Sequence, residues 1–410
     1  MSMDTKTLVD WVLGSDAGFW WRFAGVAAAW ALPITLWVSL VGLISIWLER
    51  KISAHIQCRL GPMEVGPHGA LQTIADGVKL LAKEDLIPDG ADRMLFALAP
   101  ILAFAGTFVS FAVIPFGPDL IITDLDTGLY FLAAIGSLEA IGVIAAGWAS
   151  NNKWALFGSV RAATQVVCYE IPMGLAFVTV AAVAGTLSMT EIVEQQNGML
   201  WNWYLFRNPF MPLAFISYYI ASLAECKRAP FDLPEAESEL VSGFHTEYSG
   251  MRFAIFFLAE YAAMYVVSAL AVVLFLGGWY TGIAPVDKAL AASPLWGNVV
   301  GALVIITKSF ALIFVQMWLR WTLPRVRLDQ MMHLCLKVMV PIGMFVLVFA
   351  ALWQALLPYA GALNGREALY PTLGSVTGLV VFLVLVIGGW MWVRGVIRAT
   401  TSYKTANYRT

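Results

Sequence analysis

The stretch RFAIFFLAEYAAMYVVSALAVVLFLG occupies residues 252–277 and holds one acidic side chain, Glu260, inside an otherwise apolar run. A helix of this length can cross the roughly 30 Å hydrocarbon core of a bilayer. Lipid offers no hydrogen-bond partners to the backbone, so a helix is the expected conformation. The stretch therefore predicts a membrane-spanning helix with an ionisable group inside it.

Similar apolar runs recur along the whole chain of 410 residues. Hydrophobic residues make up 60% of it and charged residues 13%, whereas soluble domains hold about 25% charged residues. The predicted fold class is an all-α integral membrane protein, a polytopic bundle of about nine transmembrane helices. The expected spans are 23–48, 94–115, 129–149, 156–185, 209–225, 252–277, 296–320, 337–357 and 373–393.

These spans predict three parts. An external segment covers residues 1–22, a membrane core covers 23–357, and a C-terminal extension with one further span and a cytoplasmic tail covers 358–410. Two long loops, 50–93 and 226–251, hold most of the polar residues on the inward side.

The first inward loop contains a helical pattern of apolar residues. Leu71, Ile74, Val78 and Leu81 are spaced three or four apart, and polar side chains occupy the intervening positions. This spacing predicts an amphipathic surface helix, which would lie along the membrane or close over a cavity.

Lysine and arginine predict the orientation of the chain. If loop 50–93 faces the cytoplasm, that side holds 19 of the 25 basic residues, counting the C-terminal tail. The opposite side holds five, and Lys308 lies within a span. Basic residues favour the cytoplasmic side, so the N-terminus is expected outside and the C-terminus inside.

Four expected spans contain or end in a glutamate, at Glu139, Glu170, Glu225 and Glu260. An ionisable group at the bilayer centre costs roughly 2.5–3.5 kcal/mol, so four cost on the order of 10 kcal/mol. Interacting buried acids can exchange protons as a set, which predicts a role in proton or ion handling. The alternative is structural pairing with Arg161 or Lys308.

The span 156–185 has a polar stripe. Arg161, Gln165 and Tyr169 lie one helical turn apart. Arg161 precedes Glu170 by nine residues, which places these two on opposite sides of the helix. They are therefore not expected to pair within the span.

Three further acids alternate in the second inward loop, at Glu235, Glu237 and Glu239. In an extended segment their side chains would point the same way. With Arg228 and Asp232 they would respond to charge appearing nearby, and the alternative is a solvated acidic loop.

The loop that follows the fifth span identifies a family. Residues 224–240 read AECKRAPFDLPEAESEL, and further matches are GWASN at 147–151, EYSG at 247–250 and RWTLPR at 320–325. These motifs resemble the H-type membrane subunits of proton-pumping NADH–quinone oxidoreductase, respiratory complex I, whose mitochondrial counterpart is NADH dehydrogenase subunit 1. The resemblance covers roughly residues 30–357.

The resemblance implies a core of eight helices plus an additional C-terminal one. It implies that the chain forms the membrane wall of a cavity for a quinone substrate (ubiquinone or menaquinone) and starts the charged pathway toward proton translocation. It assigns no catalytic residue, flavin, metal or iron–sulfur cluster to this chain alone. The implied partners are peripheral-arm quinone-site and iron–sulfur subunits, small membrane subunits, antiporter-like subunits and membrane lipids of a bacterial inner membrane. No nucleic acid is implied.

The resemblance also implies two sets of site residues. The quinone cavity set is Glu49, Arg50, Asp76, Arg228, Phe231, Asp232, Glu235, Glu237, Glu239, Arg320 and Arg325. The proton pathway set is Glu139, Glu170, Glu225, Glu260, Arg161, Tyr169 and Lys308.

The chain departs from the family pattern at several positions. Met63-Glu64 follows Gly61-Pro62 where the family usually continues with Asn, which puts in doubt any family contact there. Lys227 and Ala263 each replace a common Asn. The additional span 373–393 has no assigned chemistry.

The remaining residue types suggest no other site. The spacing of the four histidines and four cysteines predicts no metal centre, and each is expected in a surface or packing role. Two rival functions stay open, the membrane component of a proton-pumping hydrogenase and a stand-alone ion transporter, although no inverted repeat is evident. A passive anchor is disfavoured by the cost of the buried acids.

Overall fold

The computed structural model of the chain describes residues 19–364, 376–378, 380–385, 387–388 and 391. In this part the chain forms helices joined by loops, without a β-strand. The longer helices are α2 (Phe19–Ile56), α3 (Gln72–Ala82), α4 (Arg93–Ser110), α5 (Gly128–Ala149), α6 (Lys153–Ala184), α9 (Met211–Glu225), α11 (Gly250–Phe275), α13 (Pro294–Thr322) and α15 (Val340–Asn364). The shorter ones are α7 (Met189–Glu194), α8 (Tyr204–Arg207), α10 (Glu237–Leu240), α12 (Ala284–Ala291) and α14 (Leu328–His333).

Within the described residues, seven helices are long and apolar enough to cross a membrane, which confirms the predicted all-α polytopic class. The expected span 209–225 corresponds to α9, which has 15 residues and is about 22 Å long at 1.5 Å per residue. Most of the expected ninth span, 373–393, lies outside the described residues. The same holds for residues 1–18 of the expected external segment and for most of the C-terminal extension.

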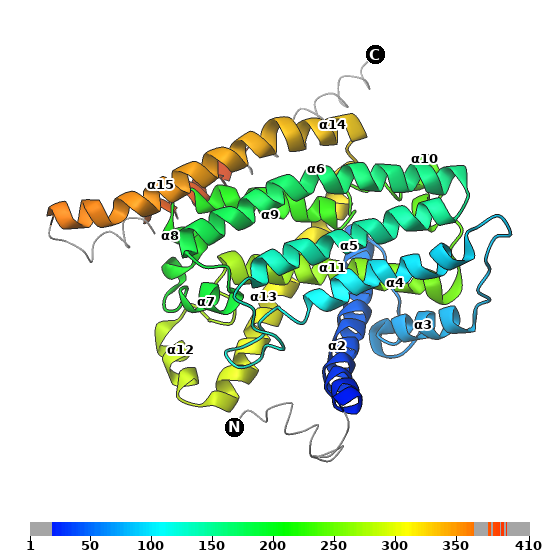
Figure 1. Cartoon of the computed structure of the whole chain (residues 1–410), viewed down its shortest axis with the longest axis horizontal. Helices are drawn as coiled ribbons and strands as arrows, with labels where there is room; N and C mark the ends of the chain where they lie inside the picture. Colours follow the sequence, from blue (N-terminus) through cyan, green and yellow to red (C-terminus); the bar gives the residue numbers. More distant parts are fainter. Residues whose placement is uncertain (1–18, 365–375, 379, 386, 389–390, 392–410) are drawn as a thin grey trace.

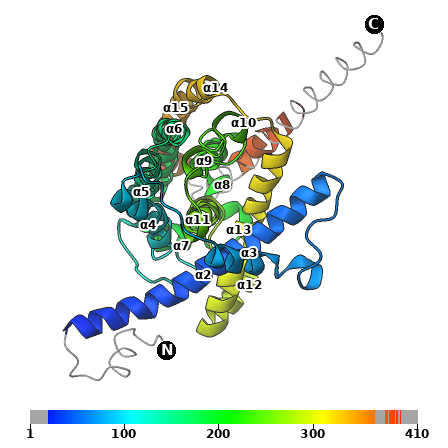
Figure 2. The ribbon, with the colours of Figure 1, turned by 90° about the vertical axis from the view of Figure 1, so that its right-hand side faces the viewer.

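Helix α11 is the central element. Its sequence is apolar on all sides, as expected for a helix surrounded by protein. In its most apolar window 89% of the residues are buried, against 22% in α13 and 28% in α2. Figure 1 shows α4, α5, α6, α9 and α15 running side by side, with α2 crossing them, and Figure 2 looks along this bundle with α11 inside it.

Small residues allow close approach between neighbouring helices. Gly142 on α5 lies against the backbone of Ala103 on α4, where an added Cβ would come within 2.5 Å of the Ala103 nitrogen. Close backbone contact of this kind is a common way for membrane helices to associate.

Side-chain caps fix helix starts, since Asp92 accepts from the backbone N–H of Met94 at 3.1 Å and begins α4.

Two helix ends differ from the expected spans. Helix α2 continues past the expected end at residue 48 to Ile56, so Glu49 is helical and Arg50 belongs to the helix rather than to loop 50–93. Helix α4 ends at Ser110 instead of 115, because the chain turns through residues 111–118 toward Pro115 and Pro118.

The predicted amphipathic helix is confirmed as α3, which packs against α2 and α11. The two long polar loops, 50–93 and 226–251, meet at one end of the bundle, where the backbone N–H of Leu86 donates to Ser249 Oγ at 3.1 Å. Helix α14, a six-residue π-helix at Leu334–Met339 and α15 form one continuous rod that packs against α6.

Candidate functional site

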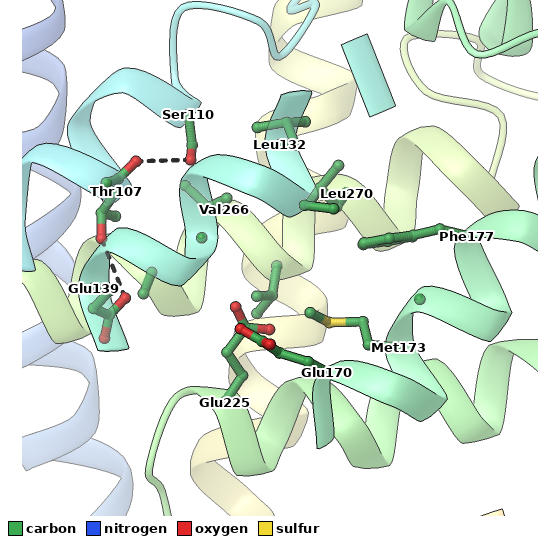
Figure 3. A pocket seen from close by; sticks show the side chains of 16 residues that line it. Thr107, Ser110, Leu132, Glu139, Glu170, Met173, Phe177, Glu225, Val266 and Leu270 are labelled. Atoms are coloured by element: carbon green, nitrogen blue, oxygen red, sulfur yellow. Dashed lines mark hydrogen bonds between the residues drawn. The ribbon is translucent and has the colours of Figure 1, made fainter. Parts of the chain in front are cut away.

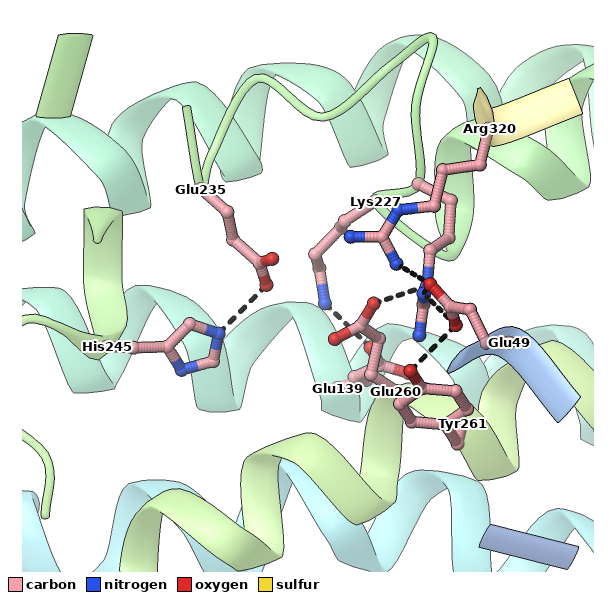
Figure 4. A network of polar contacts seen from close by, with 9 residues as sticks. Glu49, Glu139, Lys227, Glu235, His245, Glu260, Tyr261 and Arg320 are labelled. Carbon is pink, nitrogen blue, oxygen red and sulfur yellow. Dashed lines mark hydrogen bonds and ion pairs between the residues drawn. The ribbon is translucent and has the colours of Figure 1, made fainter. Parts of the chain in front are cut away.

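A cluster of buried charges lies where α2, α11, α13 and the loop after α9 converge (Figure 4). Arg228 Nη1 contacts Glu49 Oε2 at 2.7 Å and Oε1 at 3.0 Å, and Arg320 Nη1 also donates to Glu49. Tyr261 Oη donates to Glu49 at 2.7 Å. Arg228 Nε pairs with Glu260 at 2.5 Å. We call these five residues the charged junction.

The charged junction is balanced, with two guanidinium groups facing two carboxylates. Arg228 is 3% exposed, and its guanidinium carbon lies 4.3 Å from the Tyr261 ring centroid. A buried ion cluster is tolerated only when its charges are paired and hydrogen-bonded. Arg228 Nη2 is buried without a hydrogen-bond acceptor among the described residues, so its hydrogen-bonding capacity is not fully used in this arrangement.

The neighbouring residue, Lys227, makes a second ion pair. Its Nζ lies 2.7 Å from Glu139 Oε1 of α5, with side-chain exposures of 5% and 13%. Burial alone would lower the pKa of Lys227, but the adjacent Glu139 carboxylate raises it, so the lysine stays protonated. Thr107 Oγ1 donates to the other Glu139 oxygen at 3.4 Å.

Glu139 also lines a cavity of about 250 Å³ between α4, α5, α6, α9 and α11 (Figure 3). Glu170 and Glu225 point toward each other in this cavity. The described residues that line it include no lysine or arginine, and Glu225 Oε2 is buried without a hydrogen-bond partner among them. The space is large enough for several water molecules. We call it the glutamate cavity.

A small void of about 10 Å³ lies between the charged junction and the glutamate cavity. The residues that line it include Glu139, Lys227, Glu235, His245 and Glu260. His245 Nε2 lies 2.8 Å from Glu235 Oε1. Burial alone would raise the pKa of Glu235, but His245 together with Arg228 and Lys227 lowers it to about 2. Glu235 is therefore ionised at neutral pH.

His245 has the packing role expected of the histidines and, in addition, an ionisable partner. This side chain is 8% exposed, packs against Phe244 and Phe256, and its Nδ1 has no hydrogen-bond partner among the described residues. Sequence spacing missed it because Glu235 lies ten residues away across a turn.

The expectation of an extended segment at Glu235, Glu237 and Glu239 is wrong. The backbone N–H groups of Glu239 and Leu240 both donate to the Ala236 carbonyl, which closes the turn of α10. Glu235 therefore faces His245, whereas Glu239 faces Arg161 and Arg325. The side chain of Glu237 lies outside the described part of the structure.

Glu239 joins α6 to the segment after α13. Arg161 Nη1 lies 2.6 Å from one carboxylate oxygen and Arg325 Nη2 lies 2.8 Å from the other. The hydrogen bond from Arg161, with the charges of both arginines, lowers the pKa of Glu239 despite slight burial. This exposed group is separate from the charged junction.

The polar stripe of α6 faces the loop after α9, as the helical spacing suggests. Gln165 Nε2 donates to the carbonyls of Ala224 at 2.6 Å and Phe231 at 2.8 Å. Tyr169 packs on Phe231 with ring centroids 5.3 Å apart, and both are buried. Phe231 is thus a packing residue of the loop in this chain.

Three quinone-set residues lie at the margin of the junction. Arg50 Nη1 pairs with Asp76 at 2.6 Å across α2 and α3. Asp232 is partly buried, and burial together with the nearby Glu235 raises its pKa to about 6. Its Oδ1 has no hydrogen-bond partner in the described chain.

Lys308 lies apart from the glutamates. Its Nζ donates to the carbonyls of Leu276 and Tyr280 at 2.7 Å and of Gly278 at 3.1 Å, just beyond the end of α11. It also lies 4.2 Å from the Trp203 ring. This is the geometry of a cation that satisfies carbonyls at a helix C-terminus.

The fold and the site together define the class of protein. It is a polytopic membrane protein whose interior holds ion pairs and, beside them, carboxyl groups without a basic partner among the described residues. A family model described as NADH dehydrogenase matches residues 29–351. The H-type subunit of NADH-quinone oxidoreductase from Chlorobaculum tepidum is 50% identical over 360 residues, covering 86% of this chain and 98% of the relative. Its counterpart in Anaeromyxobacter dehalogenans is 41% identical over 390 residues, covering 91% and 92%.

The chain belongs to this NADH dehydrogenase family. It is a multi-pass membrane subunit of an oxidoreductase complex, NADH-quinone oxidoreductase, as its sequence resemblance predicts.

Proposed function

We propose that the chain forms the membrane wall of a quinone cavity at its inward end and starts a charged pathway that couples quinone reduction to proton translocation. The observation that supports this most strongly is the arrangement of Lys227 and Arg228. These neighbours bind carboxylates in different clusters, so one loop joins the charged junction to the glutamate cavity.

The quinone side of the proposal rests on the residues around the junction. Arg50, Asp76, Asp232 and Arg320 are partly exposed where the inward loops meet, and Arg228 Nη2 is a donor without an acceptor in the described chain. A quinone carbonyl is an acceptor suited to such donors. Glu49 and Glu235 keep the adjacent cations paired while the cavity is formed with peripheral-arm subunits.

The coupling side rests on electrostatics in a water-poor interior. Reduction of a quinone adds charge that protons then neutralise, and charge interactions are stronger away from bulk water. Glu260 shares Arg228 with Glu49, and Glu139 shares the small void with Lys227 and Glu235. A charge change at the junction therefore alters the proton affinity of groups that lead to Glu170 and Glu225. Glu139, Glu170, Glu225 and Glu260 are the proposed proton-carrying residues, with Arg161 and Tyr169 positioning the loop.

The proposal also covers the location and orientation of the chain. The distribution of basic residues supports an inner membrane with the N-terminus periplasmic and the C-terminus cytoplasmic. The relatives' names support quinone as the substrate and the other complex I subunits as partners, rather than a hydrogenase or a transporter that acts alone.

The test uses the intact complex in sealed vesicles. Glu225→Gln removes one of the three carboxyl groups of the glutamate cavity at nearly constant shape, and Glu235→Gln removes the charge that faces His245. Loss of Glu225 as a proton-transfer group is expected to lower quinone-coupled turnover and proton pumping by about 100-fold. Loss of the Glu235 charge is expected to lower quinone-coupled turnover by weakening the paired cations beside the cavity. Glu194→Gln, at an exposed acid on α7, is the matched control. Normal rates and pumping in both test variants would refute the pathway, and transport by the isolated chain would favour the stand-alone transporter.

A further inference from the structure

A second cavity lies at the end of the molecule opposite the charged junction. It has a volume of about 360 Å³ and is formed by α2, α13 and the turn after α4. Its wall includes Trp30 and Trp37 of α2 and Ala302 and Ile306 of α13, and Asp119 is the one charged residue in its described lining. We call it the outer cavity. Small-molecule binding sites in proteins typically have volumes of about 300–1,000 Å³, apolar walls and few polar groups. The outer cavity has these properties.

The surroundings of the outer cavity are those of a lipid-facing surface. Leu32 and Leu36 of α2, which also supplies Trp30 and Trp37 to the cavity wall, are 64% and 71% exposed. Apolar side chains exposed on a membrane-spanning helix meet the hydrocarbon of the bilayer. An aliphatic chain is therefore the ligand that matches both the wall and the medium beside it.

The rim of the cavity has a negative charge that is held in place. The Asp119 carboxylate accepts from Asn298 Nδ2 at 3.2 Å, and the Asp119 backbone N–H donates to Asn298 Oδ1 at 3.0 Å. The loop 116–127 contains Asp119, Asp124 and Asp126 but no lysine or arginine. An anionic headgroup would be repelled here, and a headgroup with an ammonium group would be attracted.

One polar atom of the cavity wall lacks a partner. The Trp37 indole N–H is buried and has no acceptor among the described residues. Buried donors normally find an acceptor, and a reorientation of the Trp37 ring would let an ester carbonyl between a headgroup and its acyl chain provide one. Trp37 and Asp119 line the same cavity, so one amphiphile can contact both residues.

We propose that the outer cavity binds one acyl chain of a membrane phospholipid with an ammonium headgroup, and that the headgroup lies beside Asp119. This site is distinct from the proposed quinone cavity and does not depend on it.

The experiment measures which lipid the intact complex retains. The purified complex is incorporated into nanodiscs with equal amounts of dioleoyl phosphatidylethanolamine and dioleoyl phosphatidylglycerol and exchanged into lipid-free detergent. Retained lipid is then counted by mass spectrometry, and the cavity is examined by cryo-electron microscopy. The wild-type complex should retain phosphatidylethanolamine and show an elongated density beside Trp37.

Two variants with matched controls test the assignment. Ala302→Phe fills the cavity and should lose this retained lipid, whereas Leu303→Phe, at the adjacent residue that is 57% exposed, should keep it. Asp119→Asn should retain both lipids equally, whereas Asp126→Asn should keep the preference for phosphatidylethanolamine.

Four outcomes would overturn the proposal. They are an outer cavity without lipid density, equal retention of the two lipids by the wild type, unchanged lipid content in Ala302→Phe, and a cavity filled by residues 1–18 or by the isoprenoid chain of a quinone.

Discussion

Lys227 and Glu139 form a buried ion pair 2.7 Å long between the loop after α9 and the middle of α5. Lys227 adopts a positive φ of 53°, a conformation that costs less for Asn than for Lys. The backbone at this position is therefore less favourable than it would be with Asn, and the ion pair with Glu139 is the contact that offsets this cost.

The first prediction concerns that pair. Lys227→Asn removes the cation while suiting the backbone, so any loss reports the missing ion pair. Breaking a buried pair costs about 3–5 kcal/mol when the other charge stays in place. We expect a lower midpoint of thermal dissociation of the complex, with recovery in the double variant Lys227→Asn/Glu139→Gln. If the single and double variants dissociate at the same temperature, the pair does not contribute to stability.

The second prediction concerns pH. Burial and the nearby Glu235 raise the pKa of Asp232 from 3.8 to about 6, so the folded chain holds this proton more tightly than the unfolded chain does. The stability from this residue is complete below pH 3.8 and is lost as pH rises to about 6. Asp232→Asn should remove this pH dependence and stabilise the complex above that range.

The measurement for Asp232 is thermal stability across that pH window. The matched control is Asp329→Asn, at an acid whose side chain is 74% exposed, and it should follow the wild-type curve. A wild-type dependence that persists unchanged in Asp232→Asn would assign the effect to another group.

The third prediction separates a structural from a proton-carrying role for Lys308. Its three carbonyl contacts predict that Lys308→Met loses about 1.5–3 kcal/mol of stability while the number of protons pumped per electron stays unchanged. Lys288→Met, at an exposed lysine on α12, is the control. Unchanged stability with lost pumping would instead place Lys308 in the proton pathway.

The fold was predictable from the sequence because membrane spans depend on length and apolarity alone. The all-round apolar stretch 252–277 corresponds to the central α11, and the spacing of Leu71, Ile74, Val78 and Leu81 identified α3. The helix ends were less predictable. Helix α2 continues through Glu49 and Arg50, whose charges are paired by Arg228 and Asp76, residues that are distant in sequence.

Several of the charged residues singled out from the sequence lie close together in the structure, but which of them pair with one another was not predictable. Glu260 and Glu49 were expected in different sets, yet they share Arg228. The alternation of Glu235 and Glu239 suggested a common direction, but a local turn at Ala236 separates them. Pairing depends on how loops fold back, and the periodicity of one segment holds no information about that.

The 15 residues of α9 are too few for a helix to reach from one face of a bilayer to the other. Helix α9 ends at Glu225, and the loop with Lys227 and Arg228 follows directly and is buried among the neighbouring helices. In the function proposed above, this short helix would bring the fixed positive charge of Lys227 and Arg228 nearer to a substrate dissolved in the lipid than a full-length span would.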